Sequence, residues 1–371
     1  MDPVKILKRA WNILWNYRAL WVFGLILALA TAGSSGGGSN SGTRYSVDSE
    51  NRQMPLPQEL RQGMEEFTRE MERLFREGPG QADLPISRGE LTALIWIAVI
   101  FTLVMIVLGI VVAIARYVSE TAVIRMVDEY ESTDTKMTVR EGFRIGWSRT
   151  SWRLFLINLI VNLPGILMVL ILLSVGIGIF LAFENGNLMF TPFSVIAMIG
   201  MVFLLVFGVA ILTIFLRLLR PFFWRVSALE DAGVQESFRR GWALVRENWK
   251  SVGLMWLVMI GMGIVWVLAS IILAIITLPV VLVTAAIAFA VSAIPALLLV
   301  GLFQLFLSNV LAWVLGILFV LPLFFTIAFF PWLVLGSWQA VFTSTVWTLT
   351  YREIKAMPNG KVEVAELPAA S

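Results

Sequence analysis

The side chains that could do chemistry in this sequence are few. The chain has no histidine and no cysteine, so imidazole acid–base catalysis, thiol chemistry and the usual zinc or haem ligation are excluded. The acidic stretch 128–134 could bind a cation, but the serine and threonine residues in and after it are more typical of a solvated loop. No phosphate-binding loop, nucleophile elbow or dinucleotide motif is present. We therefore expect no enzyme, no catalytic residue, no metal and no cofactor.

Uncharged polar residues within apolar stretches are the other candidates. Asn158 and Asn162 lie one helical turn apart, so in a helix they share a face. They either hydrogen-bond between helices or line a small polar cavity, to which Gln304 and Asn309 could also belong. Packing is the favoured interpretation, because ion-coupled transport needs ionisable residues at membrane depth and the uncharged runs contain none.

The composition is that of a membrane protein. The chain is 58% hydrophobic and 14% charged, whereas a soluble protein has roughly a quarter of its residues charged. About 20 helical residues cross a bilayer, and uncharged runs of this length occupy 91–115, 154–183 and 185–216. A fourth run, 251–351, has 101 residues without a charge. We predict an all-α polytopic transmembrane helix bundle with about six spans.

The first apolar segment, 19–32, is short and follows a basic leader. This arrangement is also typical of a signal peptide, and Ala30-Thr31-Ala32 would supply a cleavage site. Because the leader belongs to an internal repeat, described below, we favour a retained first span. The next segment, 33–90, opens with a Gly/Ser run expected to be a flexible tether. Within it, 58–77 has the apolar spacing of an amphipathic helix, which lies on the membrane or the spans, or associates with itself or a protein partner.

Charge predicts the orientation. The leader, 116–153, 217–250 and the segment after Tyr351 together carry 21 basic and 14 acidic residues. The segments that alternate with them around the spans, 33–90 and the turn at Glu184, carry 7 basic and 11 acidic residues. The positive-inside rule therefore predicts a bacterial cytoplasmic membrane protein with both termini inside and 33–90 outside.

Two basic loops contain almost the same motif. Residues 139–147 and 234–242 share six of nine positions, including Phe-Arg-x-Gly-Trp, and 7–11 is a weaker copy. A corner with an aromatic and a basic residue follows each copy, and a span follows the corner. We predict three repeated units, each an interfacial amphipathic helix and two spans. The expected segments are 1–32 (interfacial helix and first span), 33–90 (outside), 91–136 (second span and cytoplasmic extension), 137–220 (second unit), 221–355 (third unit) and 356–371 (flexible cytoplasmic tail).

The repeated units place aromatic and basic side chains where each span begins. Tryptophan and tyrosine favour the headgroup level, and basic side chains reach anionic phosphates there. Gly146, Gly241 and Ala10 would leave room for a neighbouring helix. The side chains serve as topology anchors, or they form a specific site for anionic lipid or a protein partner. They are Trp11, Tyr17, Arg18, Arg144, Trp147, Trp152, Arg153, Arg239, Trp242, Trp249 and Lys250.

The run 251–351 has two interpretations. Its length permits four spans, whereas the repeat requires two, and four prolines divide it. We predict one span after Lys250, a re-entrant or broken segment near 278–305, and a long, kinked last helix that ends near Tyr351.

The Phe-Arg-x-Gly-Trp motifs before paired spans, with the closing segment 342–354, resemble those of poorly characterised bacterial multi-pass proteins. These proteins are related to the membrane domain that accompanies some glycerophosphodiester phosphodiesterases. The resemblance covers most of the chain except 33–90. In the bifunctional members a separate soluble domain with histidine and acidic metal ligands does the catalysis. This chain lacks both, so the resemblance implies no such activity.

Two functions remain. The leading hypothesis is a non-enzymatic integral membrane protein that organises lipid or protein partners, with no nucleic-acid partner. The alternative is a transporter or channel for a neutral or lipidic solute. A continuous polar cavity that reaches Asn158, Asn162 or Gln304 would favour the alternative.

Overall fold

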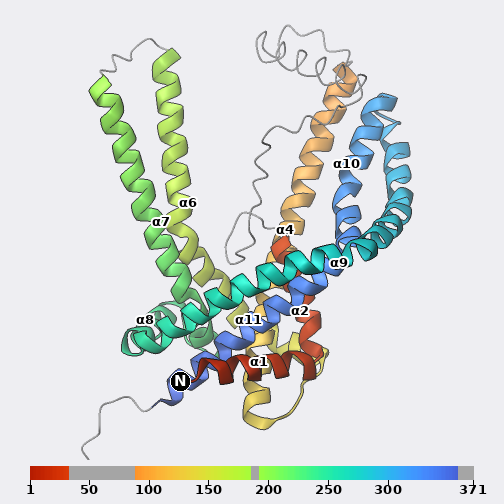
Figure 1. Ribbon diagram of the computed structural model, residues 1–371. Coiled ribbons are helices and arrows are strands. Elements are labelled where there is room, and N and C mark those ends of the chain that lie inside the picture. The colour runs from red at the N-terminus through yellow and green to blue at the C-terminus, as the bar shows by residue number, and fades with distance from the viewer. Residues whose placement is uncertain (33–87, 185–191, 358–371) are drawn as a thin grey trace, which may run out of the picture. The chain divides into compact units, whose positions relative to one another are not determined.

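The computed structural model describes residues 1–32, 88–184 and 192–357 (Figure 1). The predicted Gly/Ser tether, the 58–77 helix and the tail from 358 lie outside the described residues. All regular elements within those residues are α-helices, so the all-α prediction is confirmed. They are α1 (Pro3–Asn16), α2 (Ala19–Ala32), α4 (Arg88–Thr133), α5 (Val139–Gly146), α6 (Arg149–Glu184), α7 (Pro192–Leu229), α8 (Val234–Glu247), α9 (Trp249–Phe303), α10 (Asn309–Ala328) and α11 (Phe330–Ala356).

Five of the described helices, α4, α6, α7, α9 and α10, are long and apolar enough to cross a membrane. The protein is therefore a multi-pass membrane protein. A sixth span is obtained only if α1 and α2, which meet at 100°, are counted as one bent span. With 14 residues, α2 is about 21 Å long, which is shorter than the ~30 Å of a bilayer core.

Contacts divide the chain into two compact units. Unit 1 contains α1, α2, α5, α6, α7, α8 and α11, with α4 from Leu108 and α9 up to Ile272. Its core includes Leu14 of α1 and Phe23 of α2, which are almost completely buried. A Cβ atom on Gly24 would lie 2.6 Å from Val341 Cγ2, so α2 packs against α11 at a distance that only glycine permits.

Unit 2 contains the first part of α4, the part of α9 from Leu273, and α10. Val300, Phe303, Leu307 and Ala312 form its buried core. At Gly316 a Cβ atom would lie 2.4 Å from Val300 Cγ2, so the two arms of the α9–α10 hairpin are in close contact. In the described part of this unit, apolar packing dominates.

The structure corrects the predicted break near 278–305. Helix α9 continues through Pro279 and Pro295, and the chain reverses only after Phe303. Each proline removes one N–H donor, but an open backbone in an apolar segment would leave several groups unpaired. The reversal instead uses the polar residues Gln304 and Asn309, whose side chains hydrogen-bond at 2.8 Å. The predicted single last helix is divided at Phe329 into α10 and α11.

Candidate functional site

The three amphipathic helices of unit 1 pack through small residues against three long helices. A Cβ atom on Gly146 of α5 would lie 2.5 Å from the Val118 carbonyl oxygen of α4, and one on Gly241 of α8 would lie 2.6 Å from Phe223 Cδ1 of α7. Ala10 is completely buried in α1, which packs on α11. Each copy of the motif thus holds its helix on a long helix. We call α1, α5, α8 and the C-terminal ends of α4, α7 and α11 the charged base; in Figure 1, α1 and α8 lie at the same end of unit 1.

Local sequence explains why α5 and α8 begin where they do. The helices before them end near Asp134 and Asp231, which have positive φ angles of 55° and 50°. Aspartate tolerates this left-handed conformation, which ends helices. Thr138 and Glu141 then form a reciprocal capping box at the start of α5. Hydrogen bonds from Thr138 hold the pKa of Glu141 below its ordinary value.

Most of the predicted aromatic residues are exposed, either on the charged base or at the starts of α6 and α9, which follow it in the chain. Trp147, Trp152 and Trp249 have exposed fractions of 70%, 63% and 65%, and Trp11 and Trp242 are also exposed. Tyr17 differs, because only 2% of it is exposed. Its hydroxyl donates to the Met137 carbonyl at 3.0 Å and accepts from the Met137 N–H at 2.6 Å. Tyr17 thus joins the α1–α2 corner to the segment before α5 and is no interfacial anchor.

The predicted basic residues divide into two groups. Arg18, Arg144 and Lys250 are exposed, and the Lys250 ammonium lies 5.8 Å from the centre of the Trp249 ring. Arg239 is exposed but pairs with Glu236 at 2.9 Å. Arg153 donates to the Asp231 carbonyl at 2.5 Å. One of its nitrogens is thus engaged within unit 1, just after the end of α7, and its role in lipid binding stays a prediction.

A ring of arginines, which the sequence did not predict, ties three long helices together. Arg125 of α4 reaches the end of α7, Arg225 of α7 reaches α11 and α4, and Arg352 of α11 reaches α4. We call these three the clamp arginines. Their partners are Ala228 O at 3.0 Å and Asp231 Oδ1 at 2.5 Å for Arg125, Ser344 O at 2.9 Å and Glu120 Oε1 at 3.8 Å for Arg225, and Asp128 O at 2.9 Å with the Asp128 carboxylate for Arg352.

A second group of arginines lies beside the two candidate asparagines. Arg220 NH1 donates to Asn158 Oδ1 at 3.0 Å, and Arg217 NH2 donates to Asn162 Oδ1 at 3.2 Å. Asn162 Nδ2 donates to the Asn158 carbonyl at 2.8 Å. Arg116 of α4 immediately precedes Tyr117, whose hydroxyl accepts from Asn158 Nδ2, and its charge acts on Arg220. The three arginines and the two asparagines form what we call the amide–arginine cluster.

The sequence left two roles open for Asn158 and Asn162, which were hydrogen bonding between helices and the lining of a polar cavity. Both hydrogen-bond between helices, since Asn158 Nδ2 also donates to Tyr117 Oη of α4 at 2.8 Å. From the sequence alone, Arg217 and Arg220 count only as charges of a basic loop. The spacing of Arg217 and Arg220 was the available signal, because residues three apart share a helix face.

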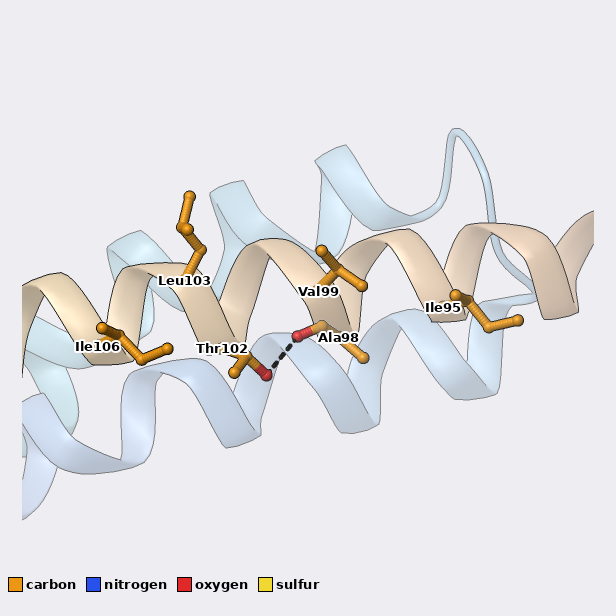
Figure 2. A pocket seen from close by; sticks show the side chains of 6 residues that line it. All are labelled: Ile95, Ala98, Val99, Thr102, Leu103 and Ile106. Atoms are coloured by element: carbon orange, nitrogen blue, oxygen red, sulfur yellow. Dashed lines mark hydrogen bonds between the residues drawn. The ribbon is translucent and has the colours of Figure 1, made fainter.

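Two pockets in the described part of the chain do not reach the candidate polar residues Asn158, Asn162 and Gln304. One, of about 470 Å³ on the surface of α4, has only Thr102 as a polar lining side chain, and Figure 2 shows Thr102 bonded to the Ala98 carbonyl, a hydrogen bond of 2.8 Å. Another, of about 180 Å³, lies between α6 and α7 and is lined by apolar side chains. Neither is lined by Asn158, Asn162 or Gln304, so neither is the polar path that a transporter would need.

Fold and site together define an all-helical, multi-pass membrane protein with an arginine-rich base. The chain belongs to DUF7544, a family of unknown function, whose model matches residues 7–344. No curated protein and no solved structure matches the chain. The family description names no activity, so the resemblance to the membrane domain of glycerophosphodiester phosphodiesterases stays a prediction.

Proposed function

We propose that this protein is a non-enzymatic membrane protein that gathers anionic lipids around its charged base and so organises lipids or protein partners. The observation that carries the proposal is the exposure of Trp147, Trp152 and Trp249 beside exposed basic residues. These aromatic side chains lie outside the packed core of unit 1 and are available to the surroundings of the protein.

The headgroup layer suits this combination of side chains. An indole ring has an apolar face and a polar N–H, and it gains most where both environments meet. A basic residue near an anionic leaflet contributes about 1 kcal/mol of attraction. Arg144 follows Phe143 in α5, and Lys250 follows Trp249 in α9. Both pairs therefore offer an aromatic ring and a cation to the same lipid layer.

Lipid recovery with the purified full-length protein tests the proposal. We expect Arg144→Gln/Lys250→Gln with Trp147→Ala/Trp249→Ala to reduce the phosphatidylglycerol recovered, relative to phosphatidylethanolamine, by about threefold or more. Trp96→Ala is the matched control, because Trp96 is as exposed but lies in the apolar part of α4. Equal phosphatidylglycerol recovery from the quadruple variant and the control would overturn the proposal.

We further propose that the charged base faces the cytoplasm of a bacterium. The support is the excess of basic residues in the segments that form it. Single cysteines at Ser39 and at the exposed Gln235 test this orientation. An impermeant thiol reagent on intact cells should label only the cysteine at position 39, and labelling at position 235 alone would reverse the orientation.

A further inference from the structure

The amide–arginine cluster carries positive charge without a carboxylate of its own. Among the described residues, no Asp or Glu oxygen lies within 4.0 Å of a nitrogen of Arg116, Arg217 or Arg220. Arg220 is only 6% exposed, and its Nε atom has no hydrogen-bond partner within the placed part of the chain. A buried guanidinium with an unused donor normally has an anionic partner.

The carboxylate that acts on Arg220 is already engaged. Glu120 is an electrostatic neighbour of Arg220, but its Oε1 accepts from Ser344 Oγ at 2.8 Å and lies 3.8 Å from Arg225 NH2. One shared carboxylate does not neutralise four guanidinium groups. The three arginines of the cluster therefore repel one another, unless an anion from outside the chain lies between them.

The surroundings of the cluster match an amphiphilic anion. Arg217 is exposed and Arg116 is half-buried, so the cluster is open on one side. Toward the apolar part of the same helices, Ile114 of α4, Leu159 of α6 and Ile214 of α7 are exposed. An anion with acyl chains would place its charge on the arginines and its chains on these side chains.

We propose that Arg116, Arg217 and Arg220 bind the phosphate group of an anionic phospholipid, while Asn158 and Asn162 hold Arg220 and Arg217 in place. Guanidinium groups match phosphate oxygens in charge and in paired hydrogen-bond geometry. The acyl chains follow the exposed faces of α6 and α7. This discrete site goes beyond the proposed function and does not rest on it, because it uses none of the interfacial tryptophans or Lys250.

Native mass spectrometry of the full-length protein, with added lipid, tests the site. The probes are phosphatidylglycerol, phosphatidylcholine as a phospholipid without net charge, and inorganic phosphate as competitor. We expect Arg116→Gln/Arg217→Gln to weaken phosphatidylglycerol binding by about tenfold or more. The control Arg140→Gln/Arg246→Gln removes the same charge from exposed positions on α5 and α8 and should change binding less than about twofold.

A conservative variant separates geometry from charge. Arg116→Lys/Arg217→Lys keeps both charges but loses the paired donors, so we expect a binding loss between those of the control and the glutamine variant. Folding of each variant is checked by its detergent melting temperature. The tryptophan and lysine variants of the interfacial helices should keep the site, which distinguishes failure of this inference from failure of the proposed function.

Three results would overturn the inference. Phosphatidylcholine that binds as tightly as phosphatidylglycerol would exclude recognition of an anion. An equal loss of phosphatidylglycerol binding in the control Arg140→Gln/Arg246→Gln would show that only the net charge of the protein matters. Inorganic phosphate that displaces the lipid at equal concentration would show that the ligand is free phosphate and that the acyl chains contribute nothing.

Discussion

The clamp arginines and the amide–arginine cluster are two groups of the same residue type in the same unit, with different partners. Arg125, Arg225 and Arg352 each lie near a carboxylate on, or just after, another helix. Of the cluster arginines, Arg217 and Arg220 contact asparagine amides instead. Arg220 and Arg225 both have an unpaired Nε, but the other donors of Arg225 are bonded to Pro221 and Ser344.

The comparison separates charges that hold the helices together from charges that are available to a ligand. A clamp arginine satisfies backbone carbonyls and a carboxylate at once, so its removal leaves several groups unpaired. In contrast, Arg217 and Arg220 each bond one asparagine amide of a neighbouring helix, so removing either arginine leaves only that amide without its partner. Stability and lipid binding should therefore respond to different arginines, and the following predictions test this division.

The largest effect on stability should come from Arg225→Met. Only 2% of Arg225 is exposed, and its loss would leave Glu120 and the Ser344 carbonyl without their cation. Breaking a buried ion pair costs about 3–5 kcal/mol. The measurement is the free energy of unfolding in mixed micelles, followed by tryptophan fluorescence. Glu120→Met/Arg225→Met should recover most of the loss, and a single variant as stable as the parent would remove Arg225 from the group of clamps.

A smaller loss of stability should follow from Gly146→Ala, which tests how closely α5 packs on α4 in the charged base. The new methyl group would lie 2.5 Å from the Val118 backbone, and overpacking costs about 1–3 kcal/mol. Gly253→Ala is the control, because nothing lies within 4 Å of its Cβ position. Alanine there should be neutral or stabilise by about 0.5 kcal/mol. Equal melting temperatures for the two variants would contradict close packing of α5 on α4.

Sequence patterns predicted the elements better than their partners. The repeated motif and its helical period predicted α5 and α8, because amphipathic spacing is local information. The ring of clamps depends on which long helices face one another, and nothing in the spacing of Arg125 or Arg352 specifies that. Tyr17 shows the same limit: its sequence neighbours match those of Trp152 and Trp249, but its side chain is buried because the α1–α2 corner packs on the segment before α5.

The predicted break in α9 failed for a different reason. Proline was weighed as a helix breaker, which is correct in water, where water bonds the freed backbone groups. In an apolar segment the unpaired groups cost more than the kink, so Pro279 and Pro295 remain inside the helix. The polar residues at 304–309 were a better signal for the reversal.

A pH-dependent contribution should come from Glu230, a carboxylate held by partners on two helices. Burial alone would raise its pKa, but hydrogen bonds from Lys355, Tyr351 and Arg240 lower the pKa to about 2. The folded state therefore gains stability above the ordinary value near 4.5 and loses it as the pH falls toward 2. Glu230→Gln should remove on the order of 1 kcal/mol of this dependence.

Unfolding free energies measured between pH 6 and pH 3 check this expectation. Glu247→Gln, at an exposed position of α8, serves as the control and should keep the pH dependence of the parent protein. A parent and a Glu230→Gln variant with parallel stability curves would show that the contacts of Glu230 do not distinguish the folded from the unfolded state.

The smallest effect on stability should come from Arg217→Gln. Arg217 is exposed, and its one described hydrogen bond is to Asn162, so in a neutral detergent the unfolding free energy should change by less than about 0.5 kcal/mol. Added phosphatidylglycerol should raise the melting temperature of the parent, because a ligand that binds only the folded state stabilises it by mass action. The variant should gain less from the same lipid, whereas Gly146→Ala, which leaves the cluster intact, should gain as much as the parent. A variant that is strongly destabilised without lipid would place Arg217 among the clamps, and an equal gain in all three proteins would remove the difference between the two groups of arginines.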